Sequence, residues 1–206
     1  MDFDQRSLPR PYDNPNIPNS LGDGTDIGAF ELHPNEVPGR TQFDFDGDRK
    51  SDISVFRPEN GTWYIQQSLS GFSGIQFGQL NDKIVPADYD CDGRTDVAAY
   101  RNGTWYLQHS TAGFTGVGFG DVNDIPQPAD FDGDGRAELV VWQPSNGTWY
   151  VLNLVMNQFN ALQFGAGEDK PVVGDYDGDE RADYAVYRPS NGTWYLQRSQ
   201  AGFTGF

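Results

Sequence analysis

Four acidic runs are the residues of this sequence best suited to chemistry, because aspartate or glutamate recurs in each at the same spacing. Counted from the first residue of each run, positions 1, 3, 5 and 9 are always acidic. The sixteen residues are Asp44, Asp46, Asp48 and Asp52; Asp88, Asp90, Asp92 and Asp96; Asp130, Asp132, Asp134 and Glu138; and Asp175, Asp177, Asp179 and Asp183. Carboxylates this close together repel one another unless a cation lies between them. The pattern therefore favours cation-binding loops over turns that are acidic by chance.

Calcium is the cation that this spacing fits best. Calcium takes six to eight oxygen ligands in flexible geometry, so a short loop can offer it the carboxylates of positions 1, 3 and 5. We expect the main-chain carbonyl of position 7 and the carboxylate of position 9 to complete the shell. Magnesium tolerates such crowding poorly, and zinc and copper favour His or Cys, whereas His33 and His109 lie outside the runs. The sequence predicts about four Ca²⁺ sites, one in each run.

The other positions of the runs have a physical explanation too. Position 2 is always aromatic, and we expect this side chain to anchor the loop in the core. Glycines at position 4 or 6 permit a sharp turn. Cys91 replaces the glycine at position 4 of the second run, where we expect Gly93 at position 6 to compensate. Glu138 replaces aspartate at position 9 of the third run, and we expect it to reach the ion with altered affinity.

The acidic runs belong to an internal repeat. The tetrapeptide Gly-Thr-Trp-Tyr occurs four times, beginning at Gly61, Gly103, Gly147 and Gly192, and a Phe-Gly pair follows three of the copies. The units span about residues 41–83, 84–125, 126–170 and 171–206. Each reads as short strands separated by turns, and no segment shows helical periodicity. Four strands in about 44 residues indicate a β-propeller blade, so we predict an all-β chain of four tandem blades.

Composition narrows the classes of function. The formal net charge is −16, which argues against binding to nucleic acid or to anionic membrane surfaces. No stretch approaches the roughly 18 apolar residues of a membrane span. The single cysteine, Cys91, rules out a disulfide within the chain. The first residues lack the features of a signal peptide, so an export signal would have to lie outside this chain.

The combined markers resemble the FG-GAP and VCBS-type repeats of bacterial surface proteins, with the propeller of integrin α-subunits as a more distant relative. The resemblance covers roughly residues 41–206 and rests on Asp-x-Asp-Gly-Asp-x-Arg-x-Asp, Arg-Pro-Ser-Asn-Gly-Thr-Trp-Tyr and Phe-Gly. It implies a propeller, calcium at the sixteen acidic residues, export, and adhesive or carbohydrate-binding roles.

The two ends of the chain differ from the repeats. Residues 1–40 do not repeat; residues 24–32 resemble the closing rung of a right-handed parallel β-helix domain, although an ordinary linker with one strand is an equal alternative. The sequence ends at Phe206, two residues before the next Phe-Gly is due. We therefore expect the fourth unit to lack its last strand and the chain to be a fragment of a longer one, either an open arc of blades or part of a larger propeller.

Three functions are compatible with these features. The leading hypothesis is a non-catalytic calcium-binding module of a secreted or cell-surface protein, for adhesion or for binding glycans or proteins. The second is a calcium-dependent polysaccharide lyase or hydrolase, for which the acids outside the runs are the candidates: Glu59, Asp82, Asp124 and Glu168. The third is a purely structural spacer. The sequence leaves the ligand and the oligomeric state open.

Overall fold

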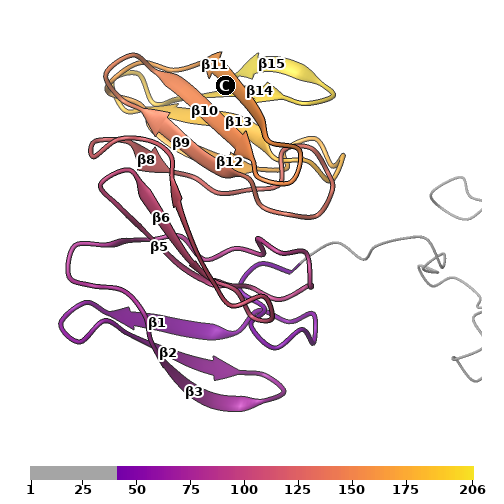
Figure 1. The fold of residues 1–206 in the computed structure, drawn as a ribbon. Coiled ribbons are helices and arrows are strands. Elements are labelled where there is room, and N and C mark those ends of the chain that lie inside the picture. The colour runs from indigo at the N-terminus through magenta and orange to yellow at the C-terminus, as the bar shows by residue number, and fades with distance from the viewer. Residues whose placement is uncertain (1–40) are drawn as a thin grey trace, which may run out of the picture. The chain divides into compact units, whose positions relative to one another are not determined.

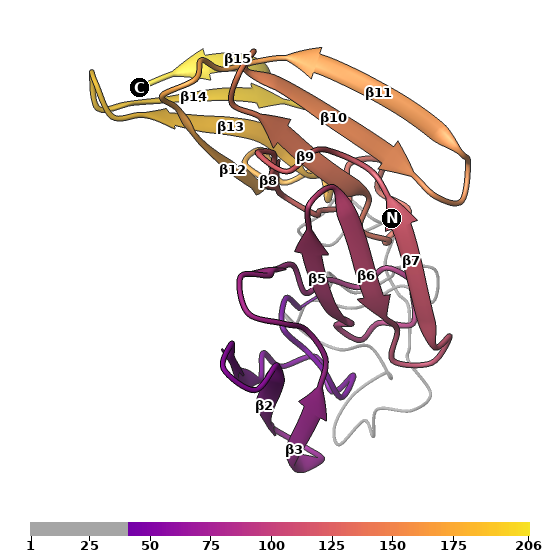
Figure 2. The same ribbon diagram turned by 60° about the vertical axis from the view of Figure 1, so that its left-hand side comes forward.

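The computed structural model divides the chain into two units, Met1–Gly39 and Arg40–Phe206, and describes residues 41–206. The described residues form antiparallel sheets and contain no helix. Four sheets follow one another around a curve as the four blades of a β-propeller, which confirms the predicted fold (Figures 1 and 2). The segment that resembles a β-helix rung lies outside the described residues. No helix in the described part of the chain is long and apolar enough to cross a membrane.

Each blade is one small sheet whose strands are neighbours in sequence. Blade 1 contains β1 (Ile53–Arg57), β2 (Thr62–Gln67) and β3 (Gly71–Gln76). Blade 2 contains β4 (Lys83–Ile84), β5 (Val97–Arg101), β6 (Thr104–Gln108) and β7 (Phe114–Gly118). Blade 3 contains β8 (Ile125–Pro126), β9 (Leu139–Gln143), β10 (Thr148–Asn153) and β11 (Gln158–Gln163). Blade 4 contains β12 (Lys170–Gly174), β13 (Asp183–Arg188), β14 (Thr193–Arg198) and β15 (Gly202–Gly205).

The last blade has the strand that the sequence predicted it would lack. β15 pairs antiparallel with β14, and the main chain of Phe206 exchanges two hydrogen bonds with that of Trp194. The prediction was wrong because the last strand of a blade ends before Phe-Gly, as β7 ends at Gly118. A unit can therefore end before Phe-Gly and still complete its sheet.

The repeated tetrapeptide and the Phe-Gly pair hold each other in place. In blade 1 the indole N–H of Trp63 donates to the carbonyl of Phe77 at 2.9 Å, and the N–H of Phe77 donates to the carbonyl of Gly61 at 2.8 Å. A Cβ on Gly61 would lie 2.3 Å from the carbonyl oxygen of Gly78, so only glycine fits there. In blade 2, Trp105 and Gly103 make the same two contacts with Phe119. A buried Trp needs a partner for its N–H, and Phe-Gly supplies it.

The cores lie between successive blades. Ala98 and Tyr100 on one face of β5 pack with Leu139 and Val141 of blade 3, and all four are at most 1% exposed. The small residue and the bulky aromatic share a face because they are two positions apart. The Trp of Gly-Thr-Trp-Tyr is also buried in the first three blades, which favours core packing over sugar stacking for this residue.

A buried carboxylate supports the turn that leads into each of the last three blades. Asp82 accepts both guanidinium N–H groups of Arg101, at 2.6 and 2.7 Å, and Asp169 pairs with Arg188 in the same way. The equivalent Asp124 is 3% exposed, but position 143 is glutamine. Burial raises the pKa of Asp124, whereas the arginine beside Asp169 lowers the pKa of that carboxyl.

Replacing Gln143 with arginine is therefore expected to stabilise the fold. Gln143→Arg supplies the ion pair found in the two neighbouring blades and should raise the free energy of unfolding by about 1 kcal/mol. Thermal unfolding followed by circular dichroism should show a rise in Tm of about 2–4 °C. The reverse change, Arg101→Gln, should lower Tm. An unchanged or lower Tm for Gln143→Arg would show that the pair adds no stability.

Candidate metal centres

Each acidic run forms a tight loop directly before the strand that leads into Gly-Thr-Trp-Tyr: before β1 in blade 1, and between the first and second strands of blades 2 to 4. We call residues 44–52, 88–96, 130–138 and 175–183 loops 1 to 4. Positions 4 and 6 both have positive φ in every loop. At position 4 the angle is 80° for Gly47 and 68° for Cys91, and at position 6 it is 69° for Arg49. The turn needs a left-handed residue at both positions, so with Cys91 and Gly93 loop 2 has one non-glycine residue there, as loops 1 and 4 do at position 6.

The first carboxylate of each loop closes this turn. Both oxygens of Asp44 accept main-chain N–H groups, from Gly47 at 2.6 Å and from Arg49 at 2.7 Å. The carboxylates of Asp130 and Asp175 accept the equivalent pairs. Main-chain hydrogen bonds thus fix the orientation of the position 1 carboxylate without an ion.

The ninth carboxylate joins the loop to the hairpin that follows the Gly-Thr-Trp-Tyr strand of the same blade. Asp52 accepts the N–H of Phe45 at 2.8 Å and the N–H of Ser68 at 2.7 Å. Asp96 makes the same contacts with Tyr89 and Ser110. The N–H of position 2 is held in this way, so its aromatic ring enters the core, where Phe45 lies 6.5 Å from Trp63 between ring centroids.

The third carboxylate has one oxygen that is bonded and one that is not. In loop 1, Oδ2 of Asp46 accepts two hairpin N–H groups, those of Leu69 and Ser70, at 2.9 and 2.8 Å. Within residues 41–206, Oδ1 of Asp46, Asp90 and Asp177 is buried and has no hydrogen-bond partner. Buried polar atoms are normally bonded, so the same unpartnered oxygen in three loops is free to accept a ligand.

In each loop the structure brings three of the four predicted ligands together. Oxygen atoms within 4.8 Å of one another come from positions 1, 3 and 5 in loops 1 and 2, and from positions 1, 3 and 9 in loops 3 and 4. Position 5 also accepts a hairpin hydroxyl, as Asp48 does from Ser68 at 2.6 Å; this bond is the main reason that the pKa of Asp48 is lowered. Such all-oxygen clusters suit a hard divalent cation, and the orphaned oxygens face no competing donor.

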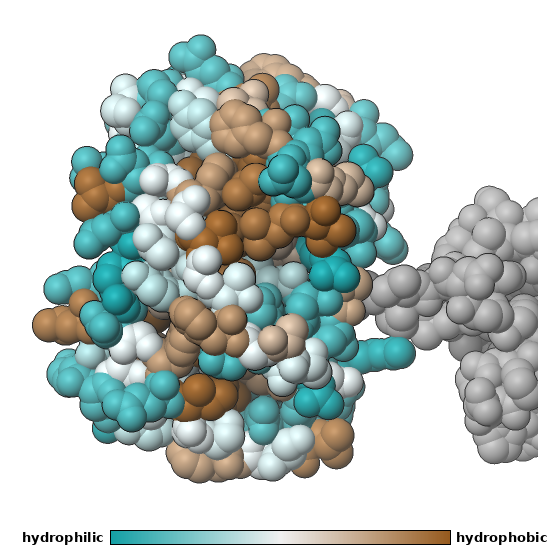
Figure 3. All heavy atoms as spheres, in the orientation of Figure 1, coloured by the Kyte–Doolittle hydropathy of each residue, from teal (hydrophilic) through white to brown (hydrophobic). Residues whose placement is uncertain are grey.

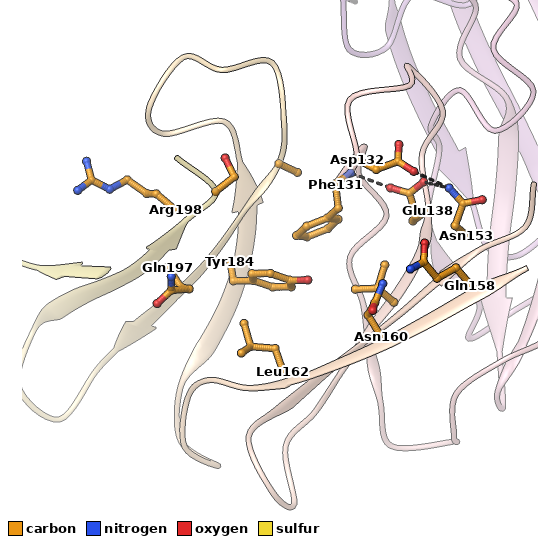
Figure 4. Close-up of a pocket in the computed structure, with 13 residues that line it drawn as sticks. Phe131, Asp132, Glu138, Asn153, Gln158, Asn160, Leu162, Tyr184, Gln197 and Arg198 are labelled. Atoms are coloured by element: carbon orange, nitrogen blue, oxygen red, sulfur yellow. Dashed lines mark hydrogen bonds between the residues drawn. The ribbon is translucent and has the colours of Figure 1, made fainter. Parts of the chain in front are cut away.

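Loop 3 differs from the others because a side-chain amide enters the cluster (Figure 4). The Nδ2 of Asn153 donates to Asp132 at 2.7 Å and to Glu138 at 3.1 Å. Its Oδ1 accepts the N–H groups of Val155 and Met156, both at 2.8 Å, which fixes the orientation of the amide. Asp132 Oδ1 accepts the N–H of Asp134, so loop 3 lacks the orphaned oxygen.

Glu138 borders a pocket of about 370 Å³ between blades 3 and 4, which Tyr184 and Arg198 also line (Figure 4). Burial, with Asp132 and Asp130 nearby, raises the pKa of Glu138 to about 7. Protons therefore compete with a cation for Glu138 near neutral pH.

His109 lies beside loop 2, which the sequence did not reveal. Its Nδ1 lies 3.1 Å from Oδ2 of Asp96 and 4.0 Å from Oδ2 of Asp90. Sequence reasoning placed His109 outside the acidic runs, which is true along the chain but not in space. It occupies the position of Gln67 in blade 1, one residue before the serine that bonds position 9. The repeat itself aligns the two residues, because each follows Gly-Thr-Trp-Tyr at the same distance, but only the folding of the hairpin onto the loop brings His109 to Asp96.

The loops are also joined to one another. The N–H of Thr95 in loop 2 donates to the carbonyl of Asp44 in loop 1 at 2.5 Å. Ala137 bonds to Asp88 at 2.8 Å, and Ala182 bonds to Asp130 at 2.6 Å, in the same way. Position 8 of each loop therefore contacts position 1 of the loop before it, and the candidate centres lie at the joints between blades.

Comparison with protein families agrees with this geometry. The model of the FG-GAP-like repeat matches residues 44–99 and 130–186, which together are more than half of the chain. The chain belongs to the FG-GAP-like repeat family. Each match begins at the first acidic residue of a loop and ends in the second strand of the following blade, β5 or β13. Loop and blade therefore recur as one unit. No curated protein sequence matches this FG-GAP-like chain.

Among solved structures, the FG-GAP-like chain is similar to BBS1N in complex with ARL6DN. For the crystal soaked with lead, the TM-score is 0.51 at 14% identity, covering 80% of this chain and 53% of that one. For the crystal soaked with mercury, the TM-score is 0.43 at 11% identity, covering 75% and 48%. The chain thus spans about half the length of these solved chains. At such identities the first comparison supports the propeller fold alone.

The acids proposed for catalysis have structural contacts. Asp82 is paired with Arg101, and Asp124 accepts the N–H of Asp121 at 2.8 Å. Glu168 accepts the hydroxyl of Ser190 at 2.7 Å. These contacts support turns of the FG-GAP-like blades.

Cys91 should weaken loop 2 through its backbone. A non-glycine residue at this φ costs about 1–2 kcal/mol, while glycine loses about 0.5–1 kcal/mol more chain entropy on folding. Cys91→Gly is therefore expected to raise the free energy of unfolding by about 0.5–1 kcal/mol in denaturant titrations. Gly178→Cys is the matched reverse change, because a Cβ there meets nothing within 4 Å, and it should destabilise the chain. A destabilised Cys91→Gly variant would mean that the thiol contributes more than the backbone costs.

Proposed function

We propose that this chain is a calcium-binding FG-GAP-like propeller module that acts without catalysis outside the cell. The observation that carries the proposal is the orphaned, buried oxygen at position 3 of loops 1, 2 and 4. The carboxylates of these loops form clusters of hard oxygen ligands around that atom. The sixteen acidic residues predicted from the sequence remain the proposed ligand set.

The four centres are not equivalent in this proposal. Loops 1, 2 and 4 are the strong sites. In loop 3 the Asn153 amide already donates hydrogen bonds to two carboxylates of the cluster, Asp132 and Glu138, which an ion would need as ligands. A donor in that position opposes a cation, so loop 3 is the weak site. In loop 2, His109 acts behind the ligands and donates its Nδ1 proton to Asp96.

The proposed role of calcium is to stabilise the joints between blades. An ion held by positions 1, 3 and 5 would fix a loop that already contacts its own hairpin and the next loop. Binding to the folded state alone adds about 2.7 kcal/mol per site when calcium is a hundredfold above Kd. Carboxylate clusters in short loops suit the affinities of extracellular calcium modules. This favours secretion or display at a cell surface.

Proteins are the proposed partners of the module, in an adhesive or scaffolding role. The propeller fold found in the similar solved structure belongs to a protein described in complex with another protein. The net charge of −16 would attract basic protein surfaces and repel nucleic acid.

Removing calcium should destabilise the chain strongly. Isothermal calorimetry on metal-stripped protein should show three strong Ca²⁺ sites and a weaker fourth, with magnesium binding more weakly at each. Excess EDTA should lower Tm by more than about 10 °C, since each filled site contributes a few kcal/mol. Asp177→Asn should remove one strong site, whereas Glu59→Gln, an exposed acid outside the loops, should remove none. No binding at millimolar calcium together with an EDTA-insensitive Tm would refute the proposal.

The weakness of loop 3 can be tested by changing a single atom. Asn153→Asp retains the oxygen that accepts Val155 and Met156 and exchanges the donating amide for a carboxylate oxygen. The variant should bind four strong calcium ions instead of three. Asn123→Asp makes the same change of charge in an exposed turn and should leave the stoichiometry unchanged. Four strong sites in the unaltered protein would show that the amide does not control loop 3.

A further inference from the structure

The outer face of blade 1 is exposed where the same face of blades 2 and 3 is buried. Ile53 and Val55 on β1 are 74% and 59% exposed. The equivalent residues of β5 and β9 are at most 3% exposed: Val97, Ala99, Leu139 and Val141. Those residues pack on the preceding blade, as Val97 does on Trp63 and Ile65. Exposed apolar side chains form patches on an otherwise polar surface in Figure 3.

The outer face of blade 4 has the complementary exposure. Its loop aromatic, Tyr176, is 41% exposed, whereas Phe45 and Tyr89 at the same position are 6% exposed. Trp194 is only partly buried, although its three counterparts are at most 2% exposed. Phe206, at the position that Ile75 occupies in blade 1, is 74% exposed. Blade 4 therefore presents the aromatic set on which a following blade packs.

The hydrogen-bonding groups and the aromatic rings of the two faces are complementary as well. Position 8 of each later loop donates its N–H to the carbonyl of position 1 in the loop before. Among residues 41–206, the corresponding N–H of Ser51 and the carbonyl of Asp175 have no such bond. Phe114 contacts Phe77 of the preceding blade at 6.2 Å between centroids, while Phe72, its equivalent in blade 1, has only Tyr64 of its own blade.

We propose that the blade 4 face of one copy docks on the blade 1 face of a second copy, head to tail. The contact repeats the three blade–blade interfaces already present within the chain, with the donor, the acceptor and the apolar residues that each of them uses. Such a contact is heterologous, so it extends until it closes. Two copies that dock at both ends make eight blades, which lies within the range of four to eight found in propeller rings.

Complementary blocking variants of the full 206-residue chain test this inference. Val55→Glu places a charge on the blade 1 face, and Phe206→Glu places one on the blade 4 face. Both positions are exposed, so the variants should fold, with circular dichroism spectra like that of the unaltered chain. Sedimentation velocity in calcium and physiological salt should show assemblies for the unaltered protein and monomers for each variant alone. An equimolar mixture of the two variants should restore a dimer, because one free face of each kind remains.

Val122→Glu is the control for added charge, since Val122 is 53% exposed in a turn outside both faces, and it should still assemble. A monomeric unaltered chain would overturn the inference and would fit a face covered by another segment of the chain. Assembly that Val55→Glu abolishes and Phe206→Glu does not would overturn head-to-tail docking in favour of a symmetric dimer. Failure of the mixture to form a dimer would overturn it too.

Discussion

The crowding of carboxylates at the joints between blades is the constraint on which the rest of this structure depends. Each loop gathers carboxylate oxygens within a few ångströms of one another, in a chain that already has a net charge of −16. Main-chain N–H groups hold most of these oxygens, from the loop itself and from a hairpin about twenty residues later. The loop and the hairpin can therefore not form independently, and the sheet between them is brought into register by the acids.

The same loop determines how one blade meets the next. The ninth carboxylate fixes the N–H of position 2, and this bond directs an aromatic ring such as Tyr89 into the cluster that blades 2 and 3 share. The carbonyl of position 1 accepts a bond from the following loop. A proposed ion at this place would act on the loop, the hairpin and the joint at once. Stability in such an array is a sum of blade terms and interface terms, so an ion at every joint would contribute to each interface.

The sequence was sufficient for the fold and for the position of the acidic clusters, because both are encoded by local repetition. The step of the markers predicted four blades, and the alternate spacing of Asp44, Asp46 and Asp48 predicted that their carboxylates converge, as they do. Two features could not be predicted. His109 reaches Asp96 only through the pairing of strands, and the role of β15 depends on where a strand ends relative to Phe-Gly. Both are non-local, and a repeat pattern describes what recurs along the chain.

The third loop shows why an acidic pattern alone does not define a metal site. Its four acids have the spacing of the others, and Glu138 differs from aspartate by one methylene. The change with the larger effect lies outside the loop, in a hairpin that is one residue longer and that replaces main-chain donors with the amide of Asn153. A main-chain N–H bonds one oxygen and leaves its neighbour open, whereas the amide spans two carboxylates. The capacity of a carboxylate cluster for a cation is thus decided by the donors that already occupy its oxygens.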